Sequence, residues 1–125
     1  MNDKKAVVVD DSPQTSQLIK LVLEMIGFNT IIEASNGVDA IDKLKKFNAD
    51  VIIMDWIMDE MNGIDCTKAI RSGIDGIDKN IPIILLTGSD VVSIEKQAYV
   101  AGADLFMKKP FSMRIFHTNL LKVLK

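Results

Sequence analysis

Acidic side chains stand where two apolar runs of this 125-residue chain end. Asp55 comes directly after the run Val51–Met54, and the pair Asp10 and Asp11 comes directly after Val7–Val9. Two adjacent carboxylates repel each other unless a cation lies between them. Asp and Glu oxygens are common Mg²⁺ ligands, used together with water and phosphate oxygens. The acids therefore suggest a divalent-cation site, although each could also be a turn or helix-capping residue.

A hydroxyl and a cation follow two further apolar runs. Thr87 comes after residues 83–86, and Lys109, joined to Pro110, comes after residues 105–107. The carboxyl ends of parallel strands meet at one sheet edge, so these side chains and the acids would lie together. Lysine can neutralise a phosphoryl oxygen. The set suits a cation beside a phosphoryl group, while a helix cap at Thr87 and an exposed Lys109 stay open as simpler interpretations.

The apolar runs alternate with segments of helical periodicity, which predicts a (βα)5 chain with a parallel sheet covered on both faces. The predicted strands lie near 5–9, 29–34, 51–54, 82–86 and 104–107. The predicted helices start after Ser12, at 36–37, near 64, near 91 and at 112. Glycines at 27, 73 and 102 are expected to end three of them. Phe47 is expected on the buried face of the second helix, and Phe116, Leu120 and Leu124 on that of the last.

Composition excludes several classes of protein. The chain is 48% hydrophobic and has a formal net charge of −2, whereas a nucleic-acid-binding surface would be strongly basic. No apolar run approaches the roughly 18 residues of a membrane span. The single cysteine, Cys66, excludes an internal disulfide and is expected to be a small, semi-buried apolar residue. We expect one cytoplasmic domain spanning residues 1–125.

Several short motifs, taken together, resemble those of the response-regulator receiver domain of two-component signalling, a chemotaxis-regulator-like single-domain type. The likeness extends from Lys5 to Leu124. The residues that carry it are Val7–Ser12, Ile53–Met58, Met61–Gly63, Leu86–Gly88, Ala101–Asp104 and Lys109–Phe111. The resemblance implies a flavodoxin-like three-layer α/β sandwich with the strand order 2-1-3-4-5.

The resemblance also implies a role for each site residue. Asp55 would be the phosphoacceptor, Lys109 the lysine that contacts phosphate, Thr87 the switch hydroxyl and Phe106 the switch aromatic. The ligands of Mg²⁺, which Mn²⁺ could replace, would be Asp10, Asp11, Asp55 and the backbone carbonyl of Ile57. Glycine at 63 and 88 would leave room for the phosphoryl group.

The implied function is a signalling switch rather than an enzyme acting on a separate substrate. A sensor histidine kinase or a histidine phosphotransfer protein would phosphorylate Asp55, and the surface of the fourth helix, fifth strand and fifth helix would then bind an effector protein in trans. No nucleic-acid or membrane partner is expected. A monomer is favoured, and a dimer through the last helices is left open. The alternatives within signalling are a phosphorelay intermediate and an excised receiver of a larger regulator or hybrid kinase.

Other classes fit less well. Phosphatases with an aspartyl nucleophile commonly have an acid two residues later, where this chain has Ile57. A flavin-binding protein of the same fold needs a hydroxyl-rich phosphate loop after the first strand, where Asp10 and Asp11 would repel phosphate. A degenerate receiver is disfavoured because the key polar positions are filled. Asp59 stands where many receivers have proline, and Ile57 and Ser89 occupy positions that vary among receivers.

Overall fold

A central parallel sheet separates two layers of helices in the computed structural model, which describes residues 4–10, 12–56, 61–88 and 92–124, and only the backbone of 92–94. The strands are β1 Lys5–Val9, β2 Thr30–Ala34, β3 Val51–Asp55, β4 Ile83–Thr87 and β5 Leu105–Lys108. The helices are α1 Pro13–Met25, α2 Gly37–Lys46, α3 Gly63–Arg71, α4 Val92–Ala101 and α5 Met113–Leu124, with a short 3₁₀ turn at Ile74–Gly76. The strand order is β2-β1-β3-β4-β5, which confirms the predicted topology.

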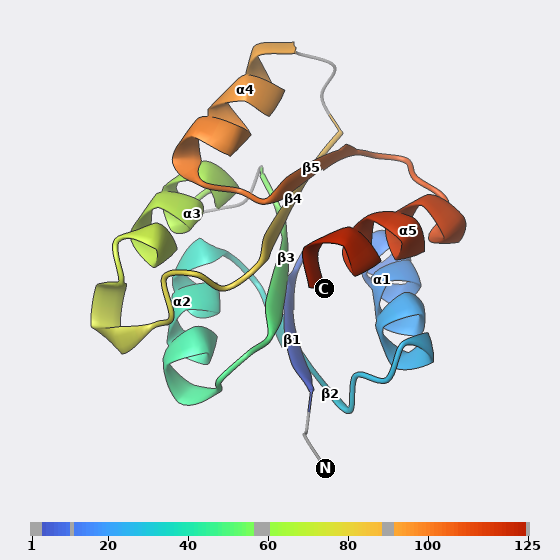
Figure 1. Ribbon diagram of the computed structural model, residues 1–125, viewed down its shortest axis with the longest axis horizontal. Coiled ribbons are helices and arrows are strands. Elements are labelled where there is room, and N and C mark those ends of the chain that lie inside the picture. The colour runs from blue at the N-terminus through green and yellow to red at the C-terminus, as the bar shows by residue number, and fades with distance from the viewer. Residues whose placement is uncertain (1–3, 11, 57–60, 89–91, 125) are drawn as a thin grey trace.

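The two faces of the sheet carry different helices. Helices α1 and α5 cover one face and α2, α3 and α4 cover the other (Figure 1). Successive residues of a strand point to opposite faces, so Val8 and Ile53 pack with α1 and α5, whereas Val9 and Met54 pack on the other side. Strands β3 and β4 are buried at every residue, as the apolar runs 51–54 and 83–86 predict.

Side-chain caps fix where the helices begin. The Ser12 hydroxyl accepts a hydrogen bond from the backbone N–H of Thr15, and Pro13 takes the first helical position, as predicted. Asn36 and Asn62 cap α2 and α3 in the same way. The glycines predicted to end helices α1, α3 and α4 all have positive φ angles and follow those helices.

Two apolar residues at helix ends are less buried than predicted. Phe47 was expected on the buried face of α2, but it is the residue after the last helical turn and remains 36% exposed. Its backbone is extended there, so the helical periodicity used for the prediction no longer applies. Leu124 is only partly buried at the end of α5, whereas Phe116 and Leu120 are fully buried as predicted.

The carboxyl ends of four strands bring the predicted site residues to one edge of the sheet. Asp10 and Lys109 follow β1 and β5, whereas Asp55 and Thr87 are themselves the last residues of β3 and β4. Asp55 and Thr87 were both predicted to lie just after their strands rather than within them. The hydrogen bonds of the sheet extend past these two residues, because the N–H of Trp56 donates to the carbonyl of Leu86 and the N–H of Lys109 donates to the carbonyl of Thr87. Among the described residues, no helix is long and apolar enough to cross a membrane.

Candidate functional site

Lys109 joins two carboxylates that come from different strands. Its Nζ lies 3.0 Å from Oδ2 of Asp55 and 2.9 Å from Oδ2 of Asp10. All three side chains are largely buried, with 18% of Lys109, 11% of Asp55 and none of Asp10 exposed. The prediction that Asp10, Asp55 and Lys109 lie close together is therefore confirmed. Two buried carboxylates against one ammonium group leave an excess of negative charge at this edge.

Asp10 has one oxygen that is well placed for a cation. Its Oδ1 accepts a hydrogen bond from the backbone N–H of Ser12 at 2.8 Å. Its buried Oδ2 lies at ion-pair distance from Lys109 but accepts no directed hydrogen bond from the described residues. A buried carboxylate oxygen without hydrogen bonds is costly unless a cation compensates it. The side chains present at this edge thus fit a hard divalent ion.

The same carboxylates control the charge of Lys109. Burial alone disfavours its ammonium form and would lower its pKa. The close contacts of its ammonium group with the negatively charged Asp10 and Asp55 outweigh burial, so the pKa of Lys109 is raised above its ordinary value. Lys109 therefore stays positively charged at neutral pH, as a contact for phosphoryl oxygen requires.

Thr87 and Phe106 lie on neighbouring strands next to this charged cluster. Thr87 is fully buried, and its carbonyl accepts the N–H of Lys109 at 2.7 Å. Phe106 is half-buried and packs on the sheet face covered by α2, α3 and α4. Its N–H donates to the hydroxyl of Tyr99, at 3.2 Å. Thr87 thus contacts Lys109 through its backbone, and Phe106 contacts α4 through Tyr99.

Two of the predicted metal ligands, Asp11 and Ile57, lie outside the described residues, as do Asp59 and Ser89. Within the described part of the chain, no three His, Cys, Asp or Glu side chains are grouped closely enough to hold a metal ion. The predicted ligand set depends on Asp11 for its third carboxylate, and that part of the hypothesis stays a prediction.

Comparison with known proteins shows which family this chain belongs to. Residues 6–121 match the family model described as response regulator receiver domain. The chain belongs to this family. As a receiver it is similar to chemotaxis protein CheY1 of Helicobacter pylori, with 40% identity over 122 residues that cover 96% of each chain. The receiver is thus a member of the two-component signalling proteins, as the sequence motifs implied.

Solved structures agree with the receiver fold. CheY4 of Vibrio cholerae has a TM-score of 0.86 and 30% identity, over 98% of this receiver and 100% of that chain. The receiver domain of the sensor histidine kinase PA1611 from Pseudomonas aeruginosa PAO1 has a TM-score of 0.82 over 98% of each chain. That protein was crystallised with a magnesium ion coordinated in its active-site cleft, but at 23% identity the likeness supports the fold alone.

Backbone contacts that were not predicted from the sequence connect Gly63 with Trp56 and Gly37 with Met61. The N–H of Gly63 donates to Trp56, and the N–H of Gly37 donates to Met61. A Cβ atom on Gly63 would lie 2.7 Å from the carbonyl oxygen of Asp55, and one on Gly37 would collide with Met61. Gly63 is therefore needed for chain packing behind the receiver's acid, a different reason from the space for a phosphoryl group that we expected.

Three other residues of the receiver have plain structural settings. Gly88 faces open space, so a side chain there would meet no described atom within 4 Å. Cys66 is fully buried rather than semi-buried, and burial raises the pKa of its thiol to about 12, so it stays protonated. His117 is partly exposed on α5. Tyr99 was missed because a solvent-exposed tyrosine gives no sequence signal of its contact with β5.

Proposed function

We propose that this receiver is a phosphoacceptor switch whose nucleophile is Asp55. The observation that supports it most directly is the pair of short contacts from Lys109 to Asp55 and Asp10, at 3.0 and 2.9 Å. A buried acid at a strand end, beside a lysine that stays charged, has the components of a phosphoryl-transfer site.

The reaction is a transfer of one phosphoryl group. A carboxylate oxygen of Asp55 attacks the phosphorus of a phosphohistidine on a partner, or of a small acyl phosphate. The P–O bond to Asp55 forms as the P–N bond, or the donor's P–O bond, breaks, and its electron pair leaves with the donor. The product is an aspartyl phosphate, a covalent product of a carboxylate nucleophile. Lys109 neutralises phosphoryl charge as its contact with Asp55 is replaced.

Mg²⁺ is the cation we expect at this site, and Mn²⁺ has the same preference for carboxylate and water ligands. Asp10, Asp11, Asp55 and the backbone carbonyl of Ile57 would hold it. When bound, the ion supplies positive charge that stabilises the transferring phosphoryl oxygens. The buried Oδ2 of Asp10 supports this assignment.

Thr87 and Phe106 would carry the signal away from Asp55. The new phosphoryl oxygens are strong hydrogen-bond acceptors, and the hydroxyl of Thr87 would move to donate to one of them. This movement opens space in which Phe106 turns inward. The surface formed by α4, β5 and α5 then changes, which biases an equilibrium between two pre-existing states.

The partners follow from this chemistry. A sensor histidine kinase or a histidine phosphotransfer protein would donate the phosphoryl group in the cytoplasm, and an effector protein would bind the switched surface. The chain would catalyse only its own phosphorylation and dephosphorylation. The likeness to chemotaxis protein CheY1 supports a regulator of the chemotaxis type. A phosphorelay intermediate, or a receiver within a larger regulator or hybrid kinase, remains the alternative, and transfer from Asp55 to a second histidine protein would identify the relay.

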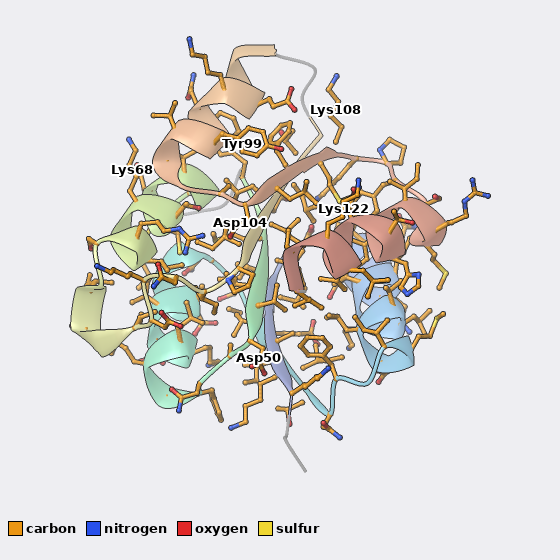
Figure 2. All side chains as sticks on the ribbon, in the orientation of Figure 1. Asp50, Lys68, Tyr99, Asp104, Lys108 and Lys122 are labelled. Carbon is orange, nitrogen blue, oxygen red and sulfur yellow. The ribbon has the colours of Figure 1, made fainter. Side chains whose placement is uncertain are left out.

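Intact mass spectrometry tests the proposal. Incubation with Mg²⁺ and acetyl phosphate, or with a cognate kinase and ATP, should add one phosphoryl group to the wild-type protein and none to Asp55→Asn. Asp50→Asn is the matched control, because Asp50 lies at the opposite edge of the sheet, where its side chain accepts the N–H of Lys5 (Figure 2). If Asp55→Asn gains the same mass, or wild type gains none with either donor, the proposal is wrong.

The lifetime of the phosphoryl group should depend on Ile57, whose structure lies outside the described residues. An isoleucine side chain cannot hydrogen-bond the attacking water, so we predict slow self-dephosphorylation. Decay of the phosphorylated protein, followed by intact mass, should be faster in Ile57→Asn than in wild type. Equal lifetimes would contradict this prediction.

A further inference from the structure

A small groove separates α3 from α4, away from Asp55. Its volume is about 220 Å³, and it is lined by Ile64, Lys68, Lys96, Gln97 and Val100. Ile64 lies almost fully buried at its base, whereas Val100 is 76% exposed at its side. Lys68 projects outward beside α4 (Figure 2). The groove thus offers an apolar surface between two lysines.

The two lysines of this groove are not neutralised locally. In the ranges that the structure describes, neither Lys68 nor Lys96 forms an ion pair or a side-chain hydrogen bond. By contrast, Lys20, Lys43, Lys45 and Lys46 each have an acidic partner within 4 Å. Two cationic heads with aliphatic stems beside exposed valine favour a ligand that is both apolar and anionic.

The groove is on the side of α4 that borders α3, and no residue of β5 lines it. Tyr99 faces β5, because its hydroxyl accepts the N–H of Phe106. Lys96 and Val100 are four residues apart and share the face of α4 that borders α3. A partner in this groove would therefore contact α3 and α4 without contacting Phe106 or any other residue of β5.

We propose that the groove between α3 and α4 binds a short segment of a partner protein in which an apolar side chain is flanked by Asp or Glu. The apolar side chain packs on Ile64 and Val100, and the carboxylates pair with Lys68 and Lys96. Binding is weak, with a Kd of roughly 0.1–1 mM for an isolated peptide, because the groove accepts little more than one side chain. The proposal does not depend on phosphorylation of Asp55.

Blocked peptides and ¹⁵N-labelled protein test the proposal by amide chemical-shift changes. The first peptide has one leucine between two pairs of glutamates, the second has serine in place of leucine, and the third has lysines in place of glutamates. Only the first should shift the amides around 64–68 and 96–100. Raising the salt concentration should weaken its binding, because screening acts on exposed charges.

Substitutions then separate the two kinds of contact. Lys68→Gln and Lys96→Gln should each weaken binding of the first peptide about twofold to fivefold. Val100→Ser should weaken it about tenfold through lost apolar burial. Lys122→Gln and Leu121→Ser are the matched controls on exposed α5 and should bind as wild type does. The amide spectra of the same samples report whether each variant is folded.

Three results would overturn the proposal. Equal binding of the serine peptide would mean simple attraction of anions. Shifts confined to β5 and α5, or no shift at millimolar peptide, would mean that the groove has no such ligand. Competition by a single-stranded oligonucleotide at equal affinity would assign Lys68 and Lys96 to a phosphate-binding surface instead.

Discussion

Lys109 is the residue on which the electrostatic balance of the site depends. It is the described cation that lies within ion-pair distance of both Asp10 and Asp55. Removing it would leave two buried carboxylates facing each other, whereas removing one carboxylate would relieve their repulsion. Sites built for ligands commonly cost stability in this way.

Asp10→Asn should therefore stabilise the protein when divalent cations are absent. We expect the free energy of unfolding, measured by urea denaturation in EDTA, to rise by about 1 kcal/mol because one buried charge is lost. Addition of Mg²⁺ should stabilise wild type and have little effect on the variant, since binding to the folded state alone adds stability. Asp50→Asn serves as control and should keep the full response to Mg²⁺. Loss of stability in Asp10→Asn would contradict this account.

Gly63→Ala should destabilise the packing of the chain behind Asp55. The new methyl group would lie 2.7 Å from the Asp55 carbonyl oxygen and 3.0 Å from the Cα of Trp56, and neither backbone atom can move easily. Overpacking of this kind costs roughly 1–3 kcal/mol. Gly88→Ala, which adds the same methyl group into open space, should change the free energy of unfolding by much less. Similar urea midpoints for the two variants would refute the packing argument.

Among the secondary-structure elements, prediction from sequence succeeded where local chemistry decides the outcome. The cap at Ser12, the glycine after α3 and the unbroken apolar sequence of β4 act within a few residues, and each element was found as expected. The strand order needed the family resemblance, because the helical and strand periods do not specify which strands are neighbours.

Contacts between elements that are far apart in the sequence could not be predicted in detail. The three-way contact of Lys109 with Asp10 and Asp55 was inferred only as a meeting at one edge, without its pairing pattern. Arg71 was not noticed at all. Most of its hydrogen bonds go to backbone carbonyls, and a carbonyl acceptor leaves no signature in the side-chain pattern.

Arg71 connects the end of α3 to two other segments. Its guanidinium donates to the carbonyls of Gly102, Lys79 and Ile81 at 2.7–2.8 Å and to Oδ2 of Asp104 at 2.8 Å. The same Asp104 oxygen accepts the N–H of Ile83 at the start of β4. One side chain thus fixes the positions of the α4–β5 turn and the segment before β4.

Arg71→Met should lower the free energy of unfolding by about 2–3 kcal/mol, because it leaves carbonyls and a carboxylate without their charged donor. Urea denaturation followed by circular dichroism measures the change. Arg114→Met is the matched control, since Arg114 is exposed on α5 and makes no ion pair with the described residues. A loss of less than 0.5 kcal/mol, roughly what a plain surface substitution gives, would show that the Arg71 contacts contribute little.

At the scale of the whole molecule, one sheet supports two separate apolar cores. The core under α1 and α5 and the core under α2, α3 and α4 share the same strands through alternating residues. Val8 and Val9, for example, are neighbours in β1 but belong to opposite cores. Loss of either helical layer would expose the sheet that the other layer needs.

We therefore predict that the chain unfolds as one cooperative unit, as the single-domain interpretation requires. Fluorescence of Trp56, the only tryptophan, reports the site, and circular dichroism reports all the helices. Their urea transitions should have the same midpoint and the same slope. Two separated transitions would mean that the two helical layers are independent and would contradict the prediction.

The contact of Arg71 with Gly102 has a mechanical consequence for α4. The hydrogen bond fixes the chain at Gly102, one residue after α4 ends. Since α4 has ten residues and is about 15 Å long, it can pivot about this fixed end. If Gly102 stays in place, a rotation of α4 by about 10° moves its first residue, Val92, by roughly 2.5 Å, while Ala101 barely moves. The amplitude of any signal carried by α4 should then grow along the helix toward Val92, the end nearest in sequence to Thr87.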